Sequence, residues 1–294
     1  MTTVTQIFDR YEAVRHRIPE ARFDARTAEI NSLIEITQHA DAFVFDAFGV
    51  LNVGETPIPG AAERLDDLRA TGKEIRILSN AASYDHAGAV TKFRKLGMRL
   101  SEEEIVTSRD ATLSGLDDRL WGCIAAPSDD LSDIPFATLR LRDNLSEYDE
   151  AEGFLFLSTE TWTSARQALL TRSILKSPRP LVIANADLAA PRENGFSLEP
   201  GHYGHLLADE GIRDIRFFGK PFPEVYQMIE ASLPGVVPER IAMCGDTLHT
   251  DIIGAAALGW RTVLVTRDGL FSGHDRMTYC EASRIHPDWS LPRI

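Results

Sequence analysis

Aspartates follow two apolar runs of this sequence, and their carboxylates are the side chains best placed to act as a nucleophile or as metal ligands. Asp46 ends the strand candidate at 42–46, and Asp246 and Asp251 follow the candidate at 241–244. Runs of this kind are typical of strands buried on both faces of a parallel sheet, and open α/β sheets bind ligands at the carboxyl ends of their strands. Asp46 is therefore a candidate covalent nucleophile. Asp246 and Asp251 are candidate ligands for Mg²⁺, which prefers hard oxygen donors.

Two further strand candidates end in groups that suit a phosphate. Ser79 and Asn80 close the run at 75–79, and Lys220 follows the run at 215–218 in the sequence Gly-Lys-Pro. Hydroxyl and amide donors bind phosphate oxygens, and a lysine offsets their charge. Taken singly, these residues are more often turns, helix caps or solvated charges. Together, at the ends of strands of one predicted sheet, they indicate a site for a phosphorylated ligand.

The elements that must position these residues alternate along the chain. Strand candidates are 42–46, 75–79, 181–185, 215–218, 241–244 and 262–266, and helical patterns occupy 27–39, 61–71, 85–97, 223–233 and 251–258. This alternation predicts an α/β fold with a doubly wound parallel sheet and helices on both of its faces. The middle of the chain is less regular, which predicts a second α/β unit at 116–199. A core domain then comprises 1–115 and 200–294, with 1–40 as an N-terminal helical extension.

Composition and charge exclude several classes of protein. The 294 residues suggest two domains, and 44% hydrophobic with 26% charged residues is ordinary for a globular protein. A formal net charge of −13 disfavours nucleic acid and anionic membranes as partners. The three widely spaced cysteines favour a reduced, cytoplasmic setting. No apolar run reaches transmembrane length.

The ordered set of motifs resembles the haloacid dehalogenase superfamily of phosphohydrolases. Its four motifs stand in order as Asp46 with Gly49-Val50, Ser79-Asn80, Lys220-Pro221, and Gly245-Asp246 through Asp251. The long insertion between the second and third motifs resembles the class IIA branch, the NagD-like and p-nitrophenylphosphatase-like enzymes with a large α/β cap. Further stretches similar to that branch are Pro59-Gly60-Ala61, 105–108, Asn185-Ala186-Asp187 and 199–202.

The resemblance implies a two-step phosphoryl transfer. Asp46 would attack phosphorus and form an aspartyl-phosphate. Ser79 and Asn80 would hold the transferring phosphoryl group, and Lys220 would offset its charge. The expected activity is hydrolysis of a small phosphate ester, sugar-phosphate-like by analogy with the family. A small phosphorylated metabolite is the expected partner, and a homodimer is left open.

The resemblance also implies a cofactor and a cap. Mg²⁺ would be held by four residues, namely Asp46, the backbone carbonyl of Phe48, Asp246 and Asp251. The cap would close over the site with the turn that contains Asn185 and Asp187 and would contact the leaving group. His249, on the turn between the last two carboxylates, is expected to be exposed.

One position departs from the family pattern. Family phosphatases usually carry an acid two residues after the nucleophile, and here that residue is Phe48, which cannot transfer a proton. General acid–base help is worth roughly 10²–10⁴-fold in rate. A cap residue such as His202, His205 or Asp187 could replace it, or the substrate could have a good leaving group such as an acyl or aryl phosphate. A third interpretation is a protein that turns over very slowly and mainly binds a phosphorylated ligand.

Two alternative functions remain at this stage. Haloacid dehalogenases also have an aromatic residue two positions after the nucleophile, but they need no Mg²⁺, and two further carboxylates near Asp46 without a cation would repel one another. A decayed phosphatase that only binds ligands would have no reason to keep the nucleophile and metal set intact. Both alternatives therefore rank behind the phosphatase.

Overall fold

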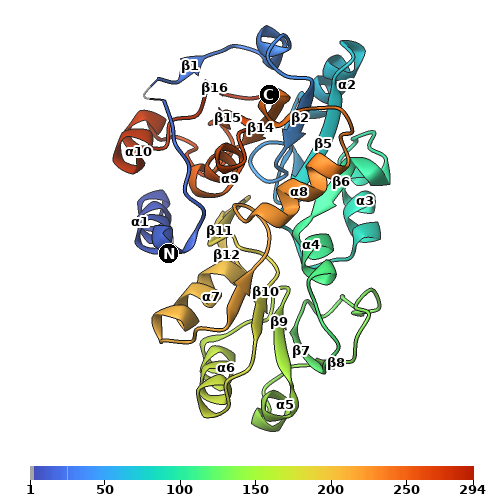
Figure 1. The fold of residues 1–294 in the computed structure, drawn as a ribbon, viewed down its shortest axis with the longest axis vertical. Coiled ribbons are helices and arrows are strands. Elements are labelled where there is room, and N and C mark those ends of the chain that lie inside the picture. Colours follow the sequence, from blue (N-terminus) through green and yellow to red (C-terminus); the bar gives the residue numbers. More distant parts are fainter. Residues whose placement is uncertain (1–2, 25) are drawn as a thin grey trace.

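Two α/β units make up the protein, one above the other (Figure 1). The computed structural model describes residues 3–24 and 26–294. The chain leaves the larger unit after α4 (Ser108–Ser114), builds the smaller unit, and returns to the larger one at α8 (Pro223–Ala231). The predicted fold class, a doubly wound parallel sheet with an inserted α/β domain, is confirmed.

The larger unit is built on a sheet of seven parallel strands. In spatial order these are β1 (Ala28–Glu29), β16 (Trp289–Leu291), β15 (Arg261–Val265), β14 (Ile241–Gly245), β2 (Ala42–Phe45), β5 (Glu74–Ser79) and β6 (Ile105–Thr107). On one face, Phe43 and Phe45 pack with residues of α2 (Ala61–Ala70) and α3 (His86–Lys95). On the other face, Val44 packs with residues of α8 and α9 (Ile253–Ala257). Because alternate side chains enter two cores, these strands have continuous apolar runs.

The smaller unit has its own sheet of five parallel strands. In spatial order these are β13 (Ile215–Phe217), β10 (Leu181–Ile183), β9 (Gly153–Phe156), β7 (Trp121–Ile124) and β8 (Thr138–Arg140), with helices α5 (Leu145–Glu150), α6 (Ser164–Lys176) and α7 (Pro200–Asp209). The predicted placement of 215–218 in the core sheet is wrong, because β13 pairs with β10. Alternation along a chain gives the order of the elements but not the sheet that each strand joins. The boundary drawn at 199 therefore leaves one strand of the smaller sheet outside the inserted unit.

The N-terminal segment differs from its prediction. The helix expected at 27–39 is wrong, since β1 and the short 3₁₀ helix η2 (Leu33–Ile36) occupy that stretch. Within the helical extension expected over 1–40, the helix is α1 (Val4–Val14), whose bounds the sequence analysis did not give; it precedes them and buries an apolar face on the larger unit. Its signal was present in the sequence: Thr3 and Gln6 form a capping box, and apolar residues recur at helical spacing from Val4 to Val14.

α1 also touches the smaller unit. Arg10 of α1 and Arg17, in η1 (Arg15–Arg17), both form ion pairs with Asp209 at the end of α7, at 2.6 and 2.8 Å. The hydroxyl of Tyr11 accepts a hydrogen bond of 3.1 Å from the backbone N–H of Leu188, in the turn after β10. The N-terminal helix thus connects the two units, beside α9 and α10 in Figure 1.

Two hairpins and a few short elements complete the fold. The hairpins are β3 (Asn52–Val53) with β4 (Thr56–Pro57), and β11 (Ala189–Arg192) with β12 (Gly195–Leu198). The remaining elements are α10 (Arg276–Ser283), the 3₁₀ helices η3 (Glu102–Glu104) and η4 (Pro238–Arg240), and the π-helical turn η5 (Leu248–Ile252). Among the described residues, no helix combines the length and apolarity needed to cross a membrane.

Candidate active site

The nucleophile candidate lies directly after the central strand β2. The backbone N–H of Asp46 donates a 2.9 Å hydrogen bond to the carbonyl of Cys244 in β14, which fixes its position relative to the neighbouring strand. The chain then turns at Gly49, where φ is +81°. A Cβ at Gly49 would lie 2.5 Å from Asp246 Oδ2 and 2.6 Å from the Cα of Gly269. Only glycine therefore allows both this backbone conformation and this close approach to Asp246.

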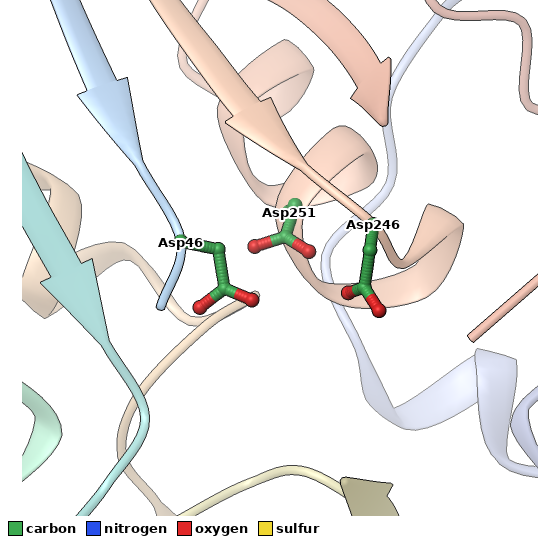
Figure 2. Close-up of side chains that lie close together, drawn as sticks. All are labelled: Asp46, Asp246 and Asp251. Carbon is green, nitrogen blue, oxygen red and sulfur yellow. The ribbon is translucent and has the colours of Figure 1, made fainter. Parts of the chain in front are cut away.

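Three carboxylates gather at this edge of the sheet (Figure 2). Asp46 follows β2, Asp246 follows β14, and Asp251 comes from the turn η5. One oxygen of each lies within 4.8 Å of the others, and all three side chains are buried. The sequence prediction that these three residues meet is confirmed. The prediction that the backbone carbonyl of Phe48 adds a fourth ligand stays a prediction.

Lys220 supplies the cation that contacts the cluster. Its buried ammonium group forms ion pairs with Asp46 and, at 2.7 Å, with Asp251. Lys220 reaches the cluster although the strand before it, β13, belongs to the smaller sheet. The predicted juxtaposition of nucleophile and lysine is therefore right, but the predicted reason for it, a common sheet, is wrong.

The electrostatics of the cluster reflect burial of more negative than positive charge. Burial raises the pKa of Asp46, against the opposing effect of Lys220, and burial together with Asp46 and Asp251 raises the pKa of Asp246 well above its usual range. Burial alone would lower the pKa of Lys220, but the surrounding carboxylates outweigh it and raise that pKa, so the ammonium keeps its charge.

This donor set fits a hard divalent cation. Its side-chain donors are carboxylate oxygens, and three carboxylates exceed the charge of one ammonium. Part of the set is already oriented by other groups. Asp246 Oδ2 accepts from the backbone N–H of Leu270 at 2.6 Å, and Asp251 Oδ2 accepts from that of Thr247 at 3.1 Å. Oxygen ligands held in this way suit Mg²⁺.

Ser79, the last residue of β5, and Asn80, which follows it, have different surroundings. Ser79 is buried and its hydroxyl accepts from the backbone N–H of Ala81 at 3.2 Å. Asn80 is tied to Lys220 twice: its Oδ1 accepts from the Lys220 N–H at 2.6 Å, and its Nδ2 donates to the Lys220 carbonyl at 2.9 Å. Asn80 therefore positions the backbone that carries the lysine. The assignment of both residues to phosphate binding stays a prediction.

The turn of the smaller unit that contains Asn185 and Asp187 reaches this same place. Asn80 Nδ2 also donates to Asp187 Oδ1, at 2.8 Å. Asn185 shapes the turn, because its Oδ1 accepts from the Asp187 N–H at 2.9 Å while its Nδ2 donates to Glu199 at 3.2 Å. The side chain of Asp187 thus bridges the two units beside Lys220.

Two adjoining cavities surround these groups. A small one is lined by the carboxylates Asp46 and Asp246 together with Lys220. A larger one, of about 570 Å³, lies between the two units and is lined by polar residues of both. A reacting phosphoryl group would have to sit at Asp46, so the larger cavity is the place for the rest of a substrate.

The ring of Phe48 is close to two cations that the sequence analysis missed. The ammonium of Lys92 lies 4.3 Å from the centre of its ring, and the guanidinium of Arg192 lies 4.8 Å from it. Each cation also has a carboxylate partner, Glu55 for Lys92 and Glu199 for Arg192. Because Lys92 comes from α3 and Arg192 from β11, no local pattern connected either residue with Phe48.

Three histidines do not behave as the sequence analysis expected. His249 is buried rather than exposed, because its ring stacks on Tyr11 and its Nε2 lies 2.5 Å from Glu12 of α1. His202 and His205, offered as replacement acids, lie on α7 and line neither cavity at the carboxylate cluster. Burial lowers the pKa of His202 to about 4 and that of His205 to about 3, so both rings are neutral near pH 7.

Comparison with protein families places the chain. A model described as haloacid dehalogenase-like hydrolase matches residues 43–123, and a second HAD-hydrolase-like model matches residues 217–292. Chronophin from Rattus norvegicus is 30% identical over 267 residues, which are 86% of this chain and 84% of chronophin. Glycerol-3-phosphate phosphatase from Homo sapiens is 28% identical over 251 residues, 76% of this chain and 78% of that protein. The chain belongs to the haloacid dehalogenase superfamily, in its class IIA branch.

Solved structures show the same fold. A possible sugar phosphatase from Cytophaga hutchinsonii superposes with a TM-score of 0.76 at 23% identity, covering 90% of this chain and 98% of its own. The p-nitrophenyl phosphatase from Archaeoglobus fulgidus gives a TM-score of 0.70 at 22% identity, covering 86% and 96%. The inserted α/β unit is thus the cap expected of this branch, and we call it the cap from here on.

Proposed function

We propose that this protein is a Mg²⁺-dependent phosphatase that hydrolyses small phosphate esters through an aspartyl-phosphate on Asp46. The observation that carries the proposal is the meeting of Asp46, Lys220, Asp246 and Asp251 at the carboxyl edge of the sheet, beneath a cap turn. The names of similar proteins support it, since they include glycerol-3-phosphate phosphatase and p-nitrophenyl phosphatase.

Each group has a role in this reaction. Asp46 attacks phosphorus, and the buried ammonium of Lys220 stabilises the charge on both partners of the attack. The hydroxyl of Ser79 and the backbone N–H of Asn80 would hold the phosphoryl oxygens, since the side chain of Asn80 is already bonded to Lys220 and Asp187. Asp46, Asp246 and Asp251, with the Phe48 carbonyl, would hold Mg²⁺, which would neutralise charge on the phosphoryl oxygens.

The larger cavity bears on the choice of substrate. Its volume of about 570 Å³ suits a small metabolite, and its lining includes the hydroxyls of Ser158 and Thr159 and two pairs of opposite charge. These groups can bond to hydroxyls of a leaving group, which supports a sugar-phosphate-like ester. We extend the proposal to a cytoplasmic setting on the ground of the three unpaired, buried cysteines.

The cluster of carboxylates argues against a dehalogenase. Halide displacement from carbon requires the nucleophile but gives no use to Asp246 and Asp251, and burial of both carboxylates beside it is costly. A divalent cation removes that cost. The geometry therefore favours the phosphatase over the dehalogenase.

The test is inorganic phosphate release from a panel of phosphomonoesters and acyl phosphates, with Mg²⁺ and with a chelator present. The parent should release phosphate only with Mg²⁺, and Asp46→Asn should release none above background. Acid-quenched parent should also carry one labile phosphate that Asp46→Asn lacks. Release by the variant at the parent's rate would refute the covalent mechanism. No release by the parent, with phosphorylated ligands still bound, would leave a binding protein instead.

A further inference from the structure

The proposed phosphatase, on which this inference rests, lacks an assigned group for proton transfer. The leaving oxygen of an alkyl phosphate departs as a strongly basic alkoxide unless a proton reaches it. The attacking water of the second step must in turn lose a proton. Phe48 occupies the position from which family members supply both transfers, so another residue must act if this chain hydrolyses alkyl esters.

The geometry of the two cavities limits where that residue can be. The ester oxygen to be protonated links the phosphoryl group, at Asp46, to the leaving group in the larger cavity. It therefore lies where the cavities join. Among the described residues, three line both cavities, namely Phe48, Asp187 and Ala190. Of these, Asp187 alone has a side chain that can give or take a proton.

The carboxyl of Asp187 is held in place for such a role. Asn80 donates to its Oδ1 at 2.8 Å, and the same amide nitrogen holds the carbonyl of Lys220 at 2.9 Å. The backbone N–H of Asp187 is bound by Asn185, which fixes the turn. Asp187 is not part of the cluster formed by the three candidate metal ligands. Its position is thus set from both units while its carboxyl is left outside the metal cluster.

The environment of Asp187 favours the protonated form that an acid needs. Burial raises its pKa well above the usual range, and although Lys220 opposes this, Asp46 and Asp251 add to it. Tyr11 of α1 carries no charge near neutral pH, since burial, together with the charge of Asp187, raises its pKa well above the usual value. A carboxyl that stays protonated can donate at the first step.

The other titratable groups of the larger cavity lie away from the junction. Seven titratable residues line the larger cavity and not the small one, namely Glu55, Tyr84, Lys92, Glu160, Arg192, Glu199 and Tyr203. Glu199 also accepts from Arg192 and Asn185, which occupies its oxygens. These groups can contact the leaving group, but none of them lines the small cavity at Asp46.

We propose that Asp187 is the general acid and base of this enzyme. In the first step the Asp46 oxygen forms a bond to phosphorus, the bond between phosphorus and the ester oxygen breaks, and the Asp187 carboxyl gives its proton to that oxygen. In the second step the Asp187 carboxylate takes a proton from the water that attacks phosphorus. The bond from phosphorus to Asp46 breaks, phosphate leaves, and Asp187 is protonated again.

The experiment compares leaving groups rather than overall rates. We expect Asp187→Asn to lower kcat/KM by about 10²–10⁴-fold for alkyl phosphates. Acetyl phosphate and p-nitrophenyl phosphate, whose leaving groups need no proton, should lose less than about tenfold by the same reasoning. Asp143→Asn, which changes an exposed cap carboxylate paired with Arg166, is the matched control and should change neither.

Each outcome decides between the inference and its alternatives. An equal loss for all substrates would make Asp187 a structural residue, and no loss would leave it without a role; either result overturns the inference while the phosphatase stands. Mg²⁺-dependent stabilisation of the variant against urea checks that its site is folded. If the variant does not fold, the test is made on the parent, by comparing kcat/KM across substrates whose leaving groups differ in basicity. A weak dependence on basicity would support a general acid, and a steep dependence would show that no acid acts. Failure of the parent on every ester would instead refute the proposed function.

Discussion

Replacing Lys220 with methionine tests the electrostatic argument for the site. Methionine nearly matches the lysine stem in volume, so the change removes the cation without opening a large cavity. It leaves Asp46 and Asp251, both buried, without their ion-pair partner. Removing one partner of a buried pair typically costs about 3–5 kcal/mol, and we expect that loss in the free energy of unfolding without Mg²⁺. Lys176→Met, which breaks an exposed ion pair with Asp149, should cost about 1 kcal/mol or less.

Urea unfolding followed by tryptophan fluorescence measures both variants, in chelator and in Mg²⁺. Saturation at a hundred times the dissociation constant stabilises the parent by about 2.7 kcal/mol. Mg²⁺ should stabilise Lys220→Met by at least as much, because the metal ion then binds carboxylates that have no other counter-charge. Adding Asp251→Asn should recover part of the loss in chelator. A loss no larger than that of Lys176→Met would refute the reasoning, since it would mean that the cluster is neutral without a metal.

Three further substitutions test particular contacts. Gly49→Ala should lower the free energy of unfolding by about 1–3 kcal/mol and weaken Mg²⁺ binding measured by calorimetry, because the new Cβ would meet Asp246. The control is Gly60→Ala, which is also at positive φ but has open space around it and should leave Mg²⁺ binding unchanged. Arg109→Met should lower the free energy of unfolding, measured in urea, by about 3–5 kcal/mol, because this buried guanidinium forms ion pairs with Asp129 and Asp133. Tyr11→Phe should lower the free energy of unfolding by about 1–3 kcal/mol, because the backbone N–H of Leu188 loses its acceptor. The same change should speed hydrogen exchange of that amide in the cap turn.

The sequence was sufficient for residues whose position follows from one buried strand. Asp46 and Asp246 end neighbouring strands β2 and β14, so their meeting follows from the parallel sheet alone. Lys220 was placed correctly for the wrong reason, because sheet membership depends on pairing between distant strands. The cations beside Phe48 come from α3 and the cap hairpin, and it is the packing of the two units against each other that brings them together.

The sequence prediction failed most clearly at the N-terminus. The apolar pattern at 27–39 predicts a helix, but Ile30, Leu33 and Ile36 are buried from extended and 3₁₀ backbone. Burial at those positions is satisfied by more than one backbone conformation, so periodicity over so short a stretch does not choose between them. The expectation that His249 is exposed on its turn is wrong because α1 covers its ring, and no local pattern around His249 indicates that contact.

The helix α1 means that the unit that folds is larger than the unit that the family defines. The matched family segments begin at residue 43, yet α1 buries Val4, Ile7 and Phe8 against η5, α9 and α10. A shortened protein starting at that boundary would expose the apolar surface beneath α1 and uncover the ring of His249. We expect such a protein to be prone to self-association. Domain boundaries taken from the matched family segments alone would therefore cut through the packed core of this protein.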